Sequence, residues 1–265
     1  MIKKIIRKLI PYKIYLNIQD TVNYFNSLKY IGNKYHCPLC HGIFNSFLSA
    51  GLKHDVIKQK NIIGAGYREN AVCPRCLSYD RERLIYLYLN EYRKYIFHDN
   101  VKILHIAPEK NLNKLFSKFK NIDYTSADLN HPSAKVKMDI TNIIYEDNVF
   151  DVILCNHVLE HVPDDKKAIS ELYRVMKAGA FGILQVPISY MIEKTEENLE
   201  IDNDNDRIKN YGQEDHVRLY GRDYLDRLKS VGFKVKVIDF ASELEVSKVE
   251  RYSLLKDEKI FLVSK

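Results

Sequence analysis

The sequence predicts an α/β fold built on a mostly parallel sheet, with a small metal-binding module in front of it. Within the segment 150–187, an apolar strand is followed by an amphipathic helix from Asp164 and then by a second apolar strand. This pattern is typical of a right-handed βαβ unit, whose parallel strands are buried on both faces. The same alternation begins at Val101, and two CxxC pairs lie N-terminal to it, at 37–40 and 73–76.

The composition suits one α/β domain of ordinary size and a small accessory module. The chain has 265 residues, 46% of them apolar, and a formal net charge of +6, a mild basicity that does not by itself indicate nucleic acid. No run approaches the roughly 18–20 apolar residues that cross a bilayer, and the N-terminus does not resemble a secretory signal. Four of the five cysteines form CxxC pairs, typical of metal ligation in a reducing compartment, so we expect a cytoplasmic protein.

Residues 1–30 form the first predicted segment, which is helical, basic and amphipathic. In MIKKIIRKLI the apolar residues recur at helical spacing, and lysines and an arginine lie between them. Two interpretations stay open for residues 1–12. Either the apolar stripe docks on the domain, or the helix holds the protein at the inner face of the membrane, where anionic lipid attracts basic helices.

Residues 31–98 form the second predicted segment, a zinc module with a connecting helix. Each CxxC pair places two thiolates on one tight turn, and two such turns complete a tetrahedral Zn²⁺ site. A site with four protein ligands is structural rather than catalytic; redox-active dithiols and bound iron are the alternatives. The predicted ligands are Cys37, Cys40, Cys73 and Cys76.

Other residues of this segment are assigned less directly. His36 and His41 flank the first pair and offer substitute ligands, although four cysteines already complete the shell. The insert between the two pairs is longer than usual, and we expect it to form a small hairpin. Residues 79–97 have apolar positions at a spacing of four and predict a helix.

Residues 99–265 form the third predicted segment, the α/β domain. The polar stretch 193–214 interrupts the α/β rhythm and predicts a loop or lid over the site. Pro108 is well placed as the first residue of a helix. In chain order we expect a strand at 101–107, a helix at 108–119, strands at 122–128 and 134–138, the βαβ unit with strands 150–155 and 181–186 joined by a helix that ends at the turn 178–180, a helix at 222–230, and strands at 232–240 and 259–265.

The run CNHVLEHVP after the fourth strand, with SADLN and KMDIT upstream, resembles the class I S-adenosylmethionine (SAM) dependent methyltransferases, of the type 11 kind. The resemblance covers Val101 to Lys265. It implies a Rossmann-like sheet of seven strands in the order 3-2-1-4-5-7-6, with strand seven antiparallel. It also implies SAM as the methyl donor.

The resemblance assigns a cofactor role to residues at three strand ends. At the first strand, HIAPE replaces the usual acidic residue and glycines, and Ala107 must be small enough to let SAM pass. At the second strand a carboxylate is expected to bind both ribose hydroxyls, and near the third another accepts from the adenine amino group. The implied cofactor-binding residues are His105, Ala107, Glu109, Asp128, Leu129, Asp139, Ile140 and Asn156.

Histidines near strand four and in EDHVRLYG are the candidate catalytic residues. His161 is a candidate general base or substrate anchor, or else it only shapes the entrance of the helix; His157 and His216 are the other acid–base candidates. Arg218 and Tyr220 are predicted to bind substrate, Arg218 through an anionic group, or else to anchor the 193–214 stretch.

We considered a zinc-protease motif for His157 and His161 and reject it. The spacing from 157 to 161 also matches HxxEH, but that motif needs a helix from its first histidine, whereas this run straddles a strand exit and a turn.

The predicted reaction is methyl transfer to an oxygen or nitrogen atom of a small molecule, a saccharide or a lipid-linked intermediate. Two alternatives remain. An RNA methyltransferase would grip RNA with the zinc module, but the mild charge and the missing base-methylation motifs make nucleic acid the less favoured partner. A non-catalytic SAM-fold scaffold would explain the glycine-poor loop at 107–111.

Overall fold

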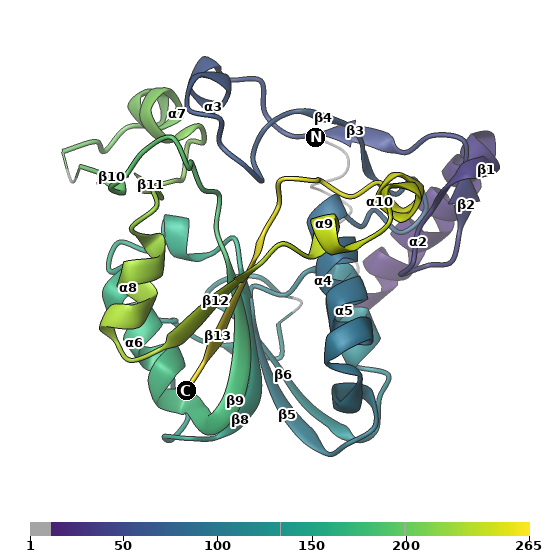
Figure 1. Ribbon diagram of the computed structural model, residues 1–265. Helices are drawn as coiled ribbons and strands as arrows, with labels where there is room; N and C mark the ends of the chain where they lie inside the picture. Colours follow the sequence, from purple (N-terminus) through teal and green to yellow (C-terminus); the bar gives the residue numbers. More distant parts are fainter. Residues whose placement is uncertain (1–11, 133, 199) are drawn as a thin grey trace.

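The computed structural model describes residues 12–132, 134–198 and 200–265. Its centre is a seven-stranded sheet in the order β12-β13-β9-β8-β5-β6-β7 (Figure 1). All neighbouring strands are parallel except β13, which is antiparallel to both β9 and β12. The predicted fold class and strand order are therefore confirmed. The strands are β5 (Val101–Ile106), β6 (Ile122–Asp128), β7 (Val136–Lys137), β8 (Phe150–Asn156), β9 (Met176–Gln185), β12 (Lys234–Ile238) and β13 (Ile260–Ser264).

Helices cover both faces of the sheet because successive strand residues point to opposite sides. Leu104 and Ile153 pack with α6 (Asp165–Val175) and α8 (Tyr224–Ser230) on one face. Ile103 and Val152 pack on the other face, with a second set of helices. That set is α4 (Asp80–Tyr92), α5 (Lys110–Phe116), α9 (Phe240–Glu243) and α10 (Val246–Tyr252), with the short 3-10 helix Lys94–Phe97.

Among the element boundaries that differ from the sequence prediction, two have a clear structural reason. Helix α5 begins at Lys110 and not at Pro108, because Ala107 adopts a left-handed φ of 46° and Glu109 is extended as the N-cap residue. Strand β9 begins at Met176, directly after α6, so the expected turn at 178–180 lies inside the strand. The pairing of β8 with β9 is irregular at that point, which accommodates the early start.

The N-terminal part consists of small elements around the cysteine pairs. The first pair lies between β1 (Ile31–His36) and β2 (Ile43–Phe44), which pair with each other. The insert is more than the expected hairpin: β3 (Leu48–Ala50) pairs with β4 (Arg68–Val72), but α3 (Asp55–Gln59) lies between them. Helix α2 (Tyr12–Ser27) and the 3-10 helix Leu28–Tyr30 precede these elements.

The predicted membrane-binding stripe lies almost entirely outside the described residues, which begin at residue 12. None of the helices in the described part of the chain is long and apolar enough to cross a membrane. The boundaries proposed for the three segments, at 30 and 98, stay predictions.

The stretch 193–214, predicted as a loop or lid, contains a short strand and a helix. Strand β10 (Glu196–Glu197) pairs with β11 (Arg218–Leu219), and α7 (Asp204–Tyr211) packs against α3 of the insert (Figure 1). Ile63 of the insert also forms a two-way backbone bridge with Ile188, which follows β9. The insert and the 193–214 stretch therefore form one cap beside the carboxyl ends of the central strands.

Arg83 of α4 joins the cysteine module to the sheet domain. Its side chain is fully buried, and its guanidinium donates hydrogen bonds of 2.7–3.1 Å to four backbone carbonyls. Two acceptors, Ala71 and Ser78, flank the second cysteine pair, and two, Tyr252 and Ser253, end α10. One side chain thus sets the position of the second cysteine turn relative to the helical layer.

We predict that Arg83→Met destabilises the protein by about 3–5 kcal/mol, because it leaves several buried carbonyls without a donor. Urea unfolding of the purified chain measures this. The matched control is Arg222→Met, since the Arg222 side chain is 61% exposed; equal unfolding midpoints for the two variants would contradict the role of Arg83.

Candidate active site and metal centre

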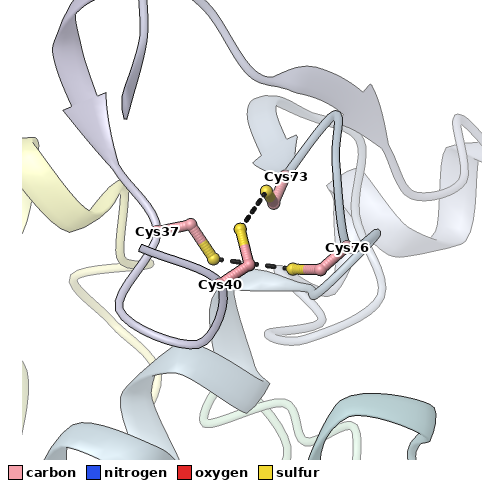
Figure 2. Close-up of side chains that lie close together, drawn as sticks. All are labelled: Cys37, Cys40, Cys73 and Cys76. Atoms are coloured by element: carbon pink, nitrogen blue, oxygen red, sulfur yellow. Dashed lines mark hydrogen bonds between the residues drawn. The ribbon is translucent and has the colours of Figure 1, made fainter. Parts of the chain in front are cut away.

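The four predicted zinc ligands come together in one cluster (Figure 2). The Sγ atoms of Cys37 and Cys76 lie 3.6 Å apart, as do those of Cys40 and Cys73. A tetrahedral Zn²⁺ ion with bonds of about 2.3 Å sets its sulfurs roughly 3.8 Å apart, so the cluster has the dimensions of a zinc site. All four cysteines are free thiols, and soft thiolate ligands suit zinc or iron.

The two cysteine turns have the same local geometry. In each, the residue after the second cysteine has a left-handed backbone, with φ of 55° at His41 and 61° at Leu77. Its amide donates to the carbonyl of the first cysteine, Cys37 or Cys73. This turn aims both thiols at one point. The cluster consists of the cysteines alone, and the flanking histidines predicted as substitutes do not belong to it.

A cavity of about 440 Å³ lies at the carboxyl ends of β5, β6 and β8. Such an edge is where ligands bind in parallel sheets. The walls bring together five of the eight predicted cofactor residues and one predicted catalytic histidine: Ala107, Asp128, Leu129, Asp139, Ile140 and His161.

Ala107 takes the backbone conformation that glycine would take in this loop. Its φ of 46° lies in the left-handed region, which costs a residue with a Cβ atom roughly 1 kcal/mol. The loop therefore keeps the shape that lets a ligand approach the backbone, although the sequence has lost the glycine. Alanine is the smallest side chain that can replace it.

Asp128 and Asp139, two of the three aspartates that line the cavity, are each held by a local turn through one carboxylate oxygen. Oδ1 of Asp128 accepts from the amides of Asn130 and His131 at 2.7 and 2.6 Å. Oδ1 of Asp139 accepts from the amide and hydroxyl of Thr141. These local turns hold both side chains at the cavity wall, so the residues present fit the ribose and adenine contacts of SAM.

The other three predicted cofactor residues form a hydrogen-bonded network that does not line the cavity. His105 is fully buried and contacts Tyr124 at 3.0 Å and Glu109 at 2.7 Å. Glu109 also accepts from Asn156 at 3.0 Å. Burial raises the pKa of Glu109, but the hydrogen bond with His105 prevails and lowers it. Glu109 therefore braces the loop. Asn156 Oδ1 is buried without a partner among the described residues and is the one atom of the network left to meet a ligand.

The three predicted catalytic histidines surround the carboxylate of Glu160. His157 Nδ1 lies 3.4 Å and His161 Nε2 lies 3.9 Å from Glu160 Oε1, and the rings of His161 and His216 are 4.8 Å apart. Burial raises the pKa of Glu160 to about 8, lowers that of His216 to about 4, and lowers that of His157 well below its usual value. Burial therefore disfavours the charged forms of Glu160, His157 and His216.

The two predicted substrate-binding residues are buried and already engaged. Arg218 donates to the carbonyls of Leu159 and Pro163 at 2.8 Å and to Glu197 at 2.9 Å. The Tyr220 hydroxyl donates to a buried carboxylate in α6 at 2.7 Å. These contacts favour the second interpretation of Arg218, an anchor for the 193–214 stretch, because all three nitrogens of its guanidinium already donate hydrogen bonds within the chain.

Three residues outside the predicted site residues also close the site: Gly64, Arg81 and Glu258. Gly64 of the insert faces His157 and Glu258, because a Cβ atom at Gly64 would lie 3.2 Å from the His157 ring and 3.4 Å from Glu258. Arg81 of α4 has a buried Nε without a partner in the described part of the chain, and it acts electrostatically on His157, Glu160 and Glu258. No local pattern marks these residues, since their role depends on segments far apart in the chain.

Comparisons with known proteins support a methyltransferase domain. Residues 108–184 match a family described as "Methyltransferase domain", and no curated protein matches the chain. A SAM dependent methyltransferase from Archaeoglobus fulgidus is 17% identical, with a TM-score of 0.44 over 69% of this chain and 93% of that one. A methyltransferase from Mesorhizobium loti is 12% identical, with a TM-score of 0.43 over 63% and 92%. Such distant similarities carry no argument about substrate.

We predict that Cys40→Ser lowers zinc affinity by at least about 100-fold, because a structural site needs all four thiolates. Elemental analysis of the purified chain, before and after dialysis against a chelator, measures this. Cys155→Ala is the control, since Cys155 is buried in the sheet core. Zinc retained in both variants would contradict the assignment.

We predict that Asp128→Asn weakens SAM binding by about 10–100-fold, the effect of losing one charge-assisted hydrogen bond worth about 1.5–3 kcal/mol. Calorimetry with SAM measures this. Asp123→Asn on the same strand is the control, because the Asp123 side chain is 69% exposed. A similar loss in both variants would point to a general effect on β6.

Proposed function

We propose, from the match of residues 108–184 to a methyltransferase domain, that the chain uses SAM to methylate an oxygen or nitrogen nucleophile of a small molecule, a saccharide or a lipid-linked intermediate in the cytoplasm. One observation carries this proposal: a single cavity is lined by both cofactor carboxylates, Asp128 and Asp139, and by the candidate catalytic residue His161. Cofactor and proton acceptor then share one wall.

SAM supplies an activated methyl group and its own leaving group. The chain must therefore hold the cofactor, align the acceptor behind the methyl group and take up the acceptor's proton. Asp128 and Asp139 hold the cofactor at the ends of β6 and β7. His161 takes up the proton of the acceptor, because it lines the cavity and its Nε2 lies 3.9 Å from the Glu160 carboxylate.

The structure of the cap favours an acceptor with many hydroxyl groups, such as a saccharide. Gly64 brings the insert against His157 and Glu258, so the acceptor side is enclosed. Several buried polar atoms there have no partner among the residues described, namely His157 Nε2, Arg81 Nε and Asn156 Oδ1. Unpaired buried donors and acceptors are costly, and a ligand with many hydroxyl groups would satisfy them.

The zinc cluster has an indirect part in this function. Arg83 ties the second cysteine turn to the start of α4. At the same helix end, Arg68 of β4 forms an ion pair with Asp80 through two hydrogen bonds, of 2.6 and 3.0 Å. This arrangement positions Arg81 at the enclosed side of the site. Loss of zinc should therefore weaken acceptor binding more than SAM binding.

The test is transfer of labelled methyl from SAM to glycan, lipid and RNA extracts. We expect a labelled product in the glycan or lipid fraction. Label in RNA alone would favour the nucleic-acid alternative, and SAM binding without any labelled product would favour a scaffold.

A variant tests the role of the shared wall. We expect His161→Ala to lower methyl transfer by about 100-fold or more while SAM still binds, the usual effect of losing an acid–base or positioning group. The exposed His98→Ala is the control. A loss of SAM affinity as large as the loss of rate would assign His161 to cofactor binding instead.

A further inference from the structure

Glu160 is the most unusual side chain of the enclosed site. It is 1% exposed, yet neither carboxylate oxygen has a hydrogen-bond partner in the described part of the chain. Its backbone is well held, because its carbonyl accepts from the amide of Val217 at 2.9 Å. A buried carboxylate without donors is costly unless it is paired or coordinates a metal ion. The Glu160 carboxylate is therefore expected to bind a ligand or a metal ion from outside the chain.

Two histidines near Glu160, the cavity-lining His161 and the buried His216, are placed as metal ligands are; His157 Nδ1 also lies 3.4 Å from Glu160 Oε1. His161 Nδ1 lies 3.2 Å from the Asp215 carbonyl and 3.3 Å from its carboxylate, so one ring nitrogen is occupied and Nε2 is directed to Glu160 at 3.9 Å. His216 is buried, and its ring has a backbone partner at Tyr211. Metal-bound histidines characteristically give their second nitrogen to a carbonyl or carboxylate in this way.

We propose that Glu160, His161 and His216 bind a divalent first-row transition-metal ion beside the SAM cavity. One ligand atom from each of the three side chains lies within 4.8 Å of the others. Ligand bonds of about 2.0–2.2 Å require the side chains to close by roughly an ångström, which small side-chain rotations provide. Two imidazoles and one carboxylate suit zinc, manganese, iron and cobalt, and leave positions open on the ion.

This site differs from the two metal patterns visible in the sequence. The cysteine cluster offers only sulfur and is closed by four protein ligands. The HxxEH spacing would use His157, whereas here His216 arrives from the other side of the 193–214 stretch. The Val217 amide bond to Glu160 brings this later segment against the short 3-10 helix Leu159–His161.

The open positions face the reaction, because His161 also lines the SAM cavity. Resting on the proposed function, the ion would bind the acceptor through an oxygen atom and favour loss of its proton, as a Lewis acid does. If the ion has this role, the methyl acceptor is a compound with a hydroxyl group. Metal binding itself does not depend on this role and can be measured alone.

The experiment titrates the full chain, prepared with one Zn²⁺ ion per chain for the cysteine cluster, with Mn²⁺ and with Co²⁺ in a calorimeter. We expect one further ion per chain. With Co²⁺, we expect weak visible bands without the intense thiolate charge-transfer band that a cysteine site would give. Glu160→Gln and His216→Ala should each weaken this binding at least tenfold, while the exposed Glu146→Gln and His98→Ala bind as the wild type does.

Two results would overturn the site: no second ion in the wild-type chain, or equal binding by the Glu160→Gln and Glu146→Gln variants. Zinc content at the cysteine cluster, measured in every variant, shows that the fold is retained. Methyl transfer measured in parallel separates the two proposals. If a second ion binds but no methyl transfer is found, the metal site is supported and the proposed function is contradicted. If methyl transfer continues after the second ion is removed, the ion's role in the reaction is contradicted.

Discussion

The buried guanidinium of Arg83 is the interaction on which the rest of the structure depends. A cation inside a protein is stable only if its donors are satisfied, and here four backbone carbonyls from three segments satisfy them. The cysteine turns, β4 and the end of α10 therefore have one relative position. From there, the insert between the two cysteine pairs runs back beside the carboxyl ends of the strands, where it packs against the 193–214 stretch.

The enclosed site is rich in buried carboxyl groups, and their hydrogen-bond partners decide their behaviour. Glu109 has His105 and Asn156 as donors, and its pKa is lowered. Burial raises the pKa of Glu82 and of Glu258 to about 7 and that of Glu160 to about 8, although Arg81 acts in the opposite direction on each. Groups of this kind gather at functional sites. Of these three, Glu160 is the one with neither oxygen hydrogen-bonded among the described residues, so it has the most capacity left for a ligand.

The cap explains how a common sheet architecture acquires a specific pocket. The sheet edge offers a cofactor cavity that is open to one side, while the acceptor side is built from segments outside the βαβ pattern. The core of this cap is small: Val56, Ile57, Ile62, Tyr211 and Leu219. A small core of this kind opens at lower cost than the main domain does, which suits a segment that must admit and release an acceptor.

The sequence by itself determined the sheet, the clustering of the four cysteines and the position of Asp128 and Asp139 at one edge of the sheet. Each depends on local information: alternating apolar runs define strands and helices, a CxxC pair lies on a single turn, and Asp128 ends its own strand. Only the tertiary structure decided that Glu109 braces the loop, that Arg218 anchors the 193–214 stretch, and that Glu160 and His161 meet His216. These outcomes depend on burial and on contacts between separate segments, such as that of Arg218 with Leu159, 59 positions away. Neither burial nor such contacts produce a periodic pattern in the sequence.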